Sequence, residues 1–255
     1  MKTTSRMKQN PTANEKNKFK HFLLLPIILC SAFVFSFLTI TLFLPNTLQK
    51  TISENFLLSS VSKPLVIIDA GHGGSDPGKI GITKTLEKEI NLEIAFYLKE
   101  LLENQDIQVI LTREKDEALS QGFETGKLSD MKERINIIQR NHPDTVISIH
   151  QNSYSDPEIL GAQCFYYADS IPGKTLASYI QEQIISSTKQ TKIREIKPNS
   201  DYYLLKHSAS PTIIVECGFL SNPTEEQLLS DKEYQRNMAW AIHLGVLKYL
   251  NACKQ

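Results

Sequence analysis

Four side chains of this sequence could carry metal or acid–base chemistry, and each lies at the boundary of a predicted strand or helix. Three apolar, strand-like runs end in such a residue and one helical segment begins with the fourth: His72, His150, Glu216 and Glu87, respectively. In open α/β sheets, functional groups gather at the carboxyl ends of strands, so these sequence-distant residues can meet at one edge. Two imidazoles and a carboxylate suit zinc with one position left open for water, and a further carboxylate could move protons.

Each of these residues also has an ordinary structural explanation. His72 lies in a glycine-rich turn, where a histidine is often only a turn residue, and His150 could be a strand-end histidine satisfied by hydrogen bonds. Glu216 could be a paired strand-end acid. However, it follows the apolar run Ile213–Val215, and burying a charge there requires a partner. From the residues alone, the metal-hydrolase reading and the structural reading both stay open.

The elements that must position these residues alternate along the chain after Pro64. Strands are predicted at 66–69, 107–111, 145–150, 162–167 and 212–215, and helices at 86–102, 129–140, 175–187 and 233–250. Thr85 is the candidate N-cap of the first helix. Because most of the strands are continuous apolar runs, the pattern favours a sheet covered by helices on both faces, an α/β domain.

The N-terminal part has a different composition. Residues 1–21 carry a net charge of +5 and the rest of the chain −5, so the basic cluster lies on a tail and does not indicate nucleic-acid binding. Residues 22–44 contain no charge and are long enough to span a bilayer, and the preceding basic residues predict a cytoplasmic N-terminus. A cleaved signal peptide is the alternative, but no small-residue cleavage site follows. We expect a basic tail (1–21), a transmembrane anchor (22–44), a linker (45–63) and an exported domain (64–255).

Four ordered motifs carry a resemblance to a known family: Val66-Ile-Ile-Asp-Ala-Gly-His-Gly-Gly74, Leu86-Glu-Lys-Glu-Ile-Asn-Leu92, Ile147-Ser-Ile-His-Gln-Asn152 and Ile214-Val-Glu-Cys-Gly-Phe-Leu-Ser-Asn222. Together they resemble the zinc-dependent N-acetylmuramoyl-L-alanine amidases, over about residues 64–251. The resemblance implies a mixed central sheet flanked by helices, and one zinc ion held by His72, Glu87 and His150. It also implies that Glu216 is the catalytic acid/base. Within the second motif, the family pattern selects Glu87 over its neighbour Glu89.

Two residues depart from the family pattern, and three further residues are candidate substrate contacts. Gln151 stands where the family usually has a small or apolar residue, and Cys217 replaces a small or aliphatic one; we interpret Cys217 as a packing residue. Arg113, Asn152 and Lys206 lie near strand ends and could contact a peptide carboxylate or a sugar. Arg113 is the best candidate because guanidinium pairs well with carboxylates, although an ion pair with Asp116 would explain it equally well.

The resemblance further implies the substrate, the setting and the partners. The expected reaction is hydrolysis of the amide between N-acetylmuramic acid and L-alanine in peptidoglycan. A short basic terminus, one anchor and a bare domain are similar to the sporulation-associated amidases that act in spore cortex, where stem-peptide removal precedes muramic-δ-lactam formation. The expected partners are peptidoglycan, a membrane through residues 22–44, and an activating protein. The alternatives are a zinc endopeptidase acting on wall peptides, and an inert membrane-anchored protein that binds or regulates wall enzymes.

Overall fold

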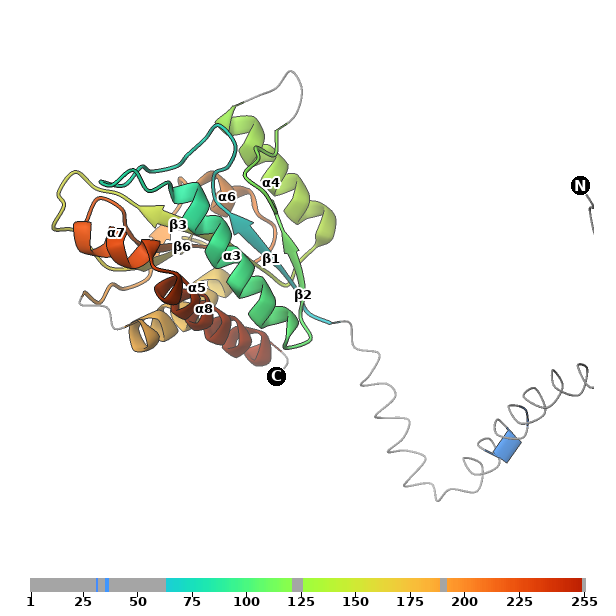
Figure 1. Ribbon diagram of the computed structural model, residues 1–255. Coiled ribbons are helices and arrows are strands. Elements are labelled where there is room, and N and C mark those ends of the chain that lie inside the picture. The colour runs from blue at the N-terminus through green and yellow to red at the C-terminus, as the bar shows by residue number, and fades with distance from the viewer. Residues whose placement is uncertain (1–30, 32–34, 37–62, 121–125, 189–191, 254–255) are drawn as a thin grey trace, which may run out of the picture. The chain divides into compact units, whose positions relative to one another are not determined.

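The computed structural model describes residues 31, 35–36, 63–120, 126–188 and 192–253. Residues Lys63–Gln255 form one compact unit, which is the coloured body in Figure 1. Within the described ranges, no helix is both long enough and apolar enough to cross a membrane. The predicted anchor, 22–44, lies outside the described residues except for three positions.

The compact unit is built on a six-stranded sheet in the order β2-β1-β3-β6-β4-β5. The strands are β1 (Leu65–Ala70), β2 (Gln108–Leu111), β3 (Thr145–Asn152), β4 (Gln163–Tyr167), β5 (Lys197–Asn199) and β6 (Thr212–Phe219). The neighbours β2-β1-β3-β6 pair in parallel, whereas β4 runs antiparallel to β6. The sheet is therefore mixed.

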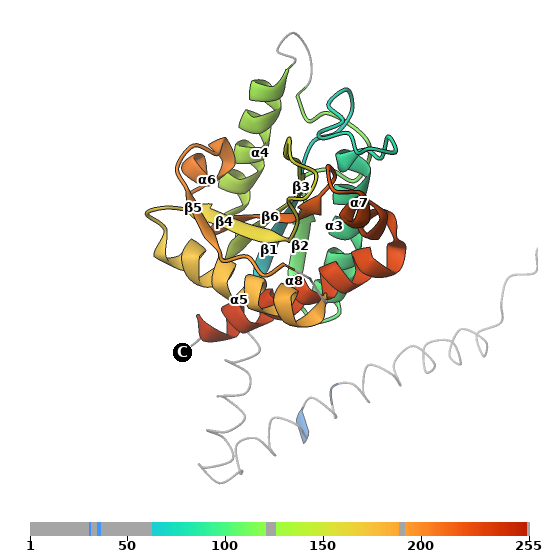
Figure 2. The same cartoon turned by 90° about the vertical axis from the view of Figure 1, so that its left-hand side faces the viewer.

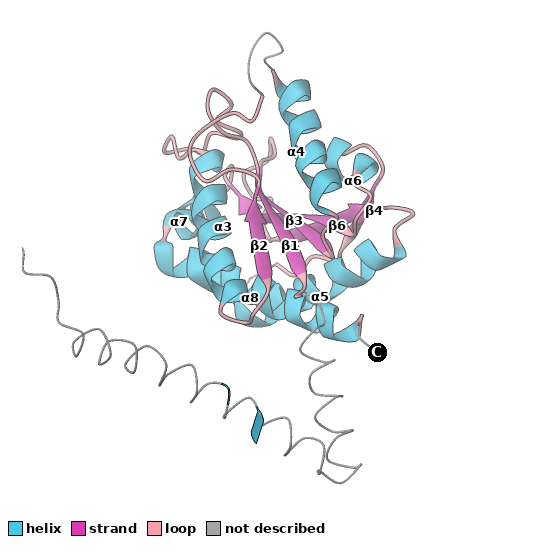
Figure 3. Cartoon of the chain, turned by 90° about the vertical axis from the view of Figure 1, so that its right-hand side faces the viewer, coloured by secondary structure: helices cyan, strands magenta, loops and turns pink. Residues whose placement is uncertain are grey.

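Helices cover both faces of this sheet, as Figures 2 and 3 show from opposite sides. The helices are α3 (Glu87–Glu103), α4 (Lys127–Asn141), α5 (Ile171–Ser187), α6 (Tyr203–His207), α7 (Pro223–Ser230) and α8 (Lys232–Ala252). The larger core cluster joins one face of the sheet to α3, α5 and α8. A smaller cluster joins the other face to α4 and α6. Because both faces are buried, the central strands can be apolar throughout, as the continuous runs predicted.

The predicted α/β class with a mixed sheet is confirmed, and the differences are local. The sequence interpretation missed β5, α6 and α7, which are short elements without a sustained period. Asn222 caps α7 by accepting a hydrogen bond from Glu225 N, with Pro223 at the first helical position. The prediction that Thr85 caps α3 is wrong, because the N-cap is Leu86 and makes no side-chain cap bond.

The sheet topology brings the carboxyl ends of β1, β3 and β6 to one edge. These three strands are adjacent and parallel, with Asp69 opposite Ser148 and His150 opposite Glu216. Residues that are 79 and 66 positions apart in the sequence are thereby held side by side on neighbouring strands. The edge that they form carries the candidate site.

Candidate active site

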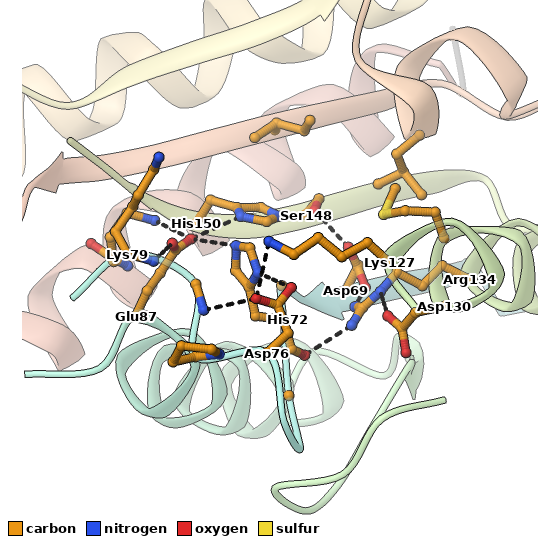
Figure 4. Close-up of a pocket in the computed structure, with 18 of the residues that line it drawn as sticks. Asp69, His72, Asp76, Lys79, Glu87, Lys127, Asp130, Arg134, Ser148 and His150 are labelled. Atoms are coloured by element: carbon orange, nitrogen blue, oxygen red, sulfur yellow. Dashed lines mark hydrogen bonds and ion pairs between the residues drawn. The ribbon is translucent and has the colours of Figure 1, made fainter. Parts of the chain in front are cut away.

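His72, Glu87 and His150 converge at this edge, and each comes from a different element. His72 lies in the turn after β1, Glu87 is the first residue of α3, and His150 lies in β3. Ligand atoms from all three lie within 4.8 Å of one another, and Figure 4 shows the side chains pointing toward one another. The two imidazole rings meet edge to face at 5.0 Å between centroids. Glu89, the neighbouring acid, is exposed on α3 instead.

The turn after β1 fixes the orientation of His72. Its backbone has φ 62°, and Gly73 and Asp76 close the turn with two main-chain hydrogen bonds. The Asp76 carboxylate lies 2.8 Å from His72 Nδ1, which leaves Nε2 facing Glu87 Oε1 at 3.1 Å. A carboxylate behind the imidazole is the arrangement that fixes the tautomer of metal-binding histidines.

Glu87 is the hub of the cluster and is 1% exposed. Its Oε1 lies 2.9 Å from His150 Nδ1 and accepts the main-chain N–H of Gln151, while Oε2 accepts the N–H of Lys79 at 2.7 Å. Burial alone would raise the pKa of Glu87, but the contacts with His150 and His72 outweigh burial and hold that pKa far below its usual range. The group is therefore an ionised carboxylate at neutral pH.

His150 is packed directly against the main chain of β1. A Cβ at Gly71 would lie 2.2 Å from the ring of His150, so only glycine allows this approach. Burial lowers the pKa of His150, but the Glu87 carboxylate outweighs that effect and raises it overall. The Gly71 position therefore explains one glycine of the first motif by steric contact.

Glu216 lies in β6, in register with His150, and is 8% exposed. Among the described residues, its Oε2 is buried and makes no hydrogen bond. Burial raises the pKa of Glu216 to about 7, His150 opposes the shift, and the charge of Glu87 adds to it. A carboxyl group whose pKa is raised toward neutrality and whose Oε2 makes no hydrogen bond suits proton transfer.

The clustered residues fit a divalent metal such as zinc. Two imidazole nitrogens and one carboxylate oxygen are the donor set of many catalytic zinc sites, which keep a fourth position open. The short contacts between Glu87 and both histidines mark the point toward which the donors converge. The unpartnered Oε2 of Glu216 supplies the further acid that the same chemistry needs.

A cavity of about 930 Å³ opens beside this cluster. Its lining includes the three clustered residues and Glu216. Met131, Leu204, Ile214 and Tyr202 contribute apolar and aromatic surface. The volume lies within the usual range for ligand sites, which combine apolar walls with a few polar groups.

The three candidate substrate contacts have different placements. Asn152 lines the cavity, whereas Lys206, on α6, is exposed and does not line it. Arg113 is 2% exposed and donates to four main-chain oxygens, those of Ala70, Gly71, Lys88 and Lys115. Its guanidinium faces the backbone of the turn, so this placement does not support the expected contact with a substrate carboxylate. Nor does Asp116 pair with it, because that carboxylate binds Lys88 and Gly74 N.

The sequence interpretation missed several residues of the site. Asp76, four residues after His72, is not among the residues that the sequence predicts for the site. Lys79 and Lys127 line the cavity, and Lys127 pairs with Asp76 at 3.3 Å.

Gln151 buries its side chain against Asn91 and donates its main-chain N–H to Glu87. Cys217 is fully buried, which raises its pKa well above the usual value and agrees with packing.

A comparison with protein families and a comparison with related sequences lead to the same family. Residues 66–248 match the family described as N-acetylmuramoyl-L-alanine amidase. The germination-specific N-acetylmuramoyl-L-alanine amidase of Bacillus subtilis is 36% identical over 193 residues, which cover 74% of this chain and 81% of that protein.

Solved structures agree with the sequence relatives. The CwlD amidase from Clostridioides difficile, solved in complex with the GerS lipoprotein, is 42% identical with a TM-score of 0.72, covering 74% of this chain and all of that one. An N-acetylmuramoyl-L-alanine amidase from Clostridium difficile 630 is 34% identical with a TM-score of 0.68, covering 75% and 98%. Because the family match spans most of the chain, this protein belongs to the N-acetylmuramoyl-L-alanine amidase family.

Proposed function

We propose that this protein is a zinc-dependent amidase that cleaves the bond between the lactyl group of N-acetylmuramic acid and L-alanine in peptidoglycan. The observation that carries the proposal is the convergence of His72, Glu87 and His150 in one cavity with Glu216, whose buried Oε2 makes no hydrogen bond. Family membership supplies the substrate class. An inert regulatory protein would have no need of all four groups in one cavity.

Residues of this chain have two roles in the reaction: some bind the metal and one transfers protons. A bound zinc ion would polarise the scissile carbonyl and make water a better nucleophile. Asp76 holds the His72 ring so that Nε2 faces Glu87. In this orientation, Nε2 of His72 presents the lone pair needed for metal ligation. Glu216 takes the proton of the attacking water and delivers it to the nitrogen of the leaving L-alanine. A pKa of about 7 allows the same group to act in both directions near neutral pH.

Digestion of purified peptidoglycan tests the reaction and separates it from the endopeptidase alternative. The protein is incubated with and without a chelator, and the products are analysed by mass spectrometry. We expect intact glycan and free stem peptides that begin with L-alanine, only in the absence of the chelator. Cleavage within the stem peptide or its cross-links would instead identify an endopeptidase.

We further propose that the substrate is spore cortex and that the reaction prepares muramic-δ-lactam formation for germination. The similarity to a germination-specific amidase supports this role. The related CwlD amidase was solved in complex with a lipoprotein, which supports a protein partner for this chain as well. Deletion of the gene should leave cortex without muramic-δ-lactam and should impair germination. A normal lactam content in the deletion strain would refute the cortex role.

We also propose that residues 22–44 anchor the protein in a membrane with the amidase domain outside the cytoplasm. The uncharged length of this segment and the basic residues before it support the assignment.

A further inference from the structure

The segment from Lys79 to Glu87 forms a closed loop whose two ends meet at the metal-binding carboxylate. The N–H of Lys79 donates to Glu87 Oε2 at 2.7 Å, and the N–H of Glu87 donates to Lys79 O at 3.0 Å. Ile80 and Leu86 form an antiparallel bridge, and Gly81 N donates to Thr85 O. The position of Glu87 therefore depends on the shape of this whole segment, which we call the 79–87 loop.

The tip of the 79–87 loop is held by Glu226, which lies 143 residues away on α7. The main-chain N–H and the hydroxyl of Thr83 both donate to Glu226 Oε1 at 2.9 Å, and the N–H also lies 3.2 Å from Oε2. Glu226 is 2% exposed, although the neighbouring loop residue Ile82 is 55% exposed. Hydrogen bonds to an ionised acceptor are stronger than neutral ones, so this carboxylate can hold the tip firmly.

Two further features make the contact with Glu226 the main tether of the loop. A Cβ at Gly81 would lie 2.1 Å from Glu226 Oε1, so the glycine lets the loop backbone approach the carboxylate. The apolar side chains of Ile80 and Ile82 are mostly exposed, so the tip gains little from core packing. The hydroxyls of Thr85 and Ser230 lie 3.4 Å apart and form a weaker link between the loop and α7.

We propose that Glu226 is a positioning residue for the metal ligand Glu87. By fixing the tip of the 79–87 loop, it fixes the main-chain groups of Lys79 that orient the Glu87 carboxylate, and thereby raises the affinity for the metal. Glu226 is not among the residues that line the cavity. This inference rests on the proposed metal-dependent function, but it concerns metal affinity and can be tested without substrate.

The neighbouring residue on α7 provides a matched control. Glu225 is also buried, and its carboxylate accepts the N–H groups of Gly161 and Phe219 at 2.8 and 2.7 Å. It makes no contact with the 79–87 loop among the described residues. Alanine substitutions at 225 and 226 therefore remove equivalent buried carboxylates from the same helix, but only one of them releases the loop.

The test measures the zinc dissociation constant of the full-length protein by competition with a chromogenic chelator, together with the thermal unfolding midpoint. We expect Glu226→Ala to weaken zinc binding by about 10-fold or more, the range seen when groups that orient metal ligands are removed. Glu225→Ala should lower the unfolding midpoint and leave the zinc dissociation constant unchanged. Glu226→Gln should bind zinc as tightly as the wild type, because its amide oxygen can still accept hydrogen bonds from the N–H and the hydroxyl of Thr83.

A second variant approaches the same contact from the loop side. Gly81→Ala places a methyl group against the Glu226 carboxylate and should also weaken zinc binding. This variant tests the contact even if Glu226→Ala fails to fold. Wild-type zinc affinity in both Glu226→Ala and Gly81→Ala would overturn the inference, as would equal losses in Glu225→Ala and Glu226→Ala. If the wild-type protein binds zinc but does not cleave peptidoglycan, the proposed function fails and the result on Glu226 still stands.

Discussion

Two glutamates in the same cavity have pKa values shifted in opposite directions. Contacts with two imidazoles hold the pKa of Glu87 far below its usual range, whereas burial raises the pKa of Glu216 to about 7. Two acids whose pKa values are shifted apart in this way can have different roles, one as a permanent anion and the other as a proton carrier. At the residue scale, this difference supports the proposed roles of Glu87 as a metal ligand and Glu216 as the proton carrier.

Replacing Glu216 by glutamine should separate catalysis from metal binding. The substitution keeps the size of the side chain but removes its ability to exchange a proton, so we expect turnover to fall by about 10²–10⁴-fold. Zinc content, measured by elemental analysis, should stay at the wild-type level. The control is Glu89→Gln, at the exposed acid two residues after Glu87. Substantial turnover in Glu216→Gln would refute the assignment.

Metal removal should reveal the ligands through stability. A ligand that binds only the folded state stabilises it by about 4 kcal/mol when its free concentration is 1,000 times the dissociation constant. A chelator should therefore lower the unfolding midpoint of the wild-type protein and of Glu216→Gln. The midpoints of His72→Ala and His150→Ala should not respond to zinc or chelator. A normal zinc-dependent shift in either histidine variant would exclude that residue as a ligand.

At the scale of elements, the turn after β1 is held from behind by two buried arginines. Arg134, on α4, pairs with Asp69 and donates to the main-chain oxygens of Ala70 and His72. Arg113 donates to the oxygens of Ala70 and Gly71. These bonds satisfy carbonyl groups that the turn withdraws from the sheet ladder. The strand, the turn and α4 thus act as one unit that places His72.

The buried Asp69 carboxylate should make the stability of this unit depend on pH. Burial opposes its ionisation, but Arg134 and the Ser148 hydroxyl hold its pKa at about 2, against an ordinary value of 3.8. Because the folded-state pKa is depressed, the stabilisation is present above the ordinary value and is lost as pH falls toward 2. The shift corresponds to about 2 kcal/mol.

Urea unfolding of the metal-free protein measures this effect. The free energy of unfolding of the wild type should exceed that of Asp69→Asn near neutral pH, because the variant leaves Arg134 without its buried partner. The gap between the two proteins should narrow by about 2 kcal/mol between about pH 4 and pH 2. A gap that does not change over this interval would show that Asp69 is not ionised in the folded state.

At the scale of the whole molecule, the long apolar strands and the periodic helices could be predicted from sequence, because burial on a covered sheet leaves a clear pattern. Strand ends then pointed to His72, His150 and Glu216. The roles of Arg113 and Glu226 could not be predicted, because a buried charge satisfied by main-chain groups has no periodicity and its partners are distant in sequence. For this reason the sequence leaves Arg113 as a candidate for either a substrate contact or an ion pair with Asp116, and it gives no signal for α7, which carries Glu226.

The membrane anchor remains a prediction from sequence, and cell fractionation can test it. In a bacterial host, the full-length protein should remain in the membrane fraction after alkaline carbonate extraction, whereas the unit from Lys63 onward should be soluble and should cleave peptidoglycan. Val34→Arg with Leu38→Arg should release the protein or block its export, since each central arginine costs about 2.5–3.5 kcal/mol on insertion scales. Val34→Ile with Leu38→Ile should behave as wild type.

Protease added to protoplasts should digest the amidase domain of the wild type. A protected domain, or full-length protein in the carbonate supernatant, would show that residues 22–44 do not anchor it with the predicted orientation.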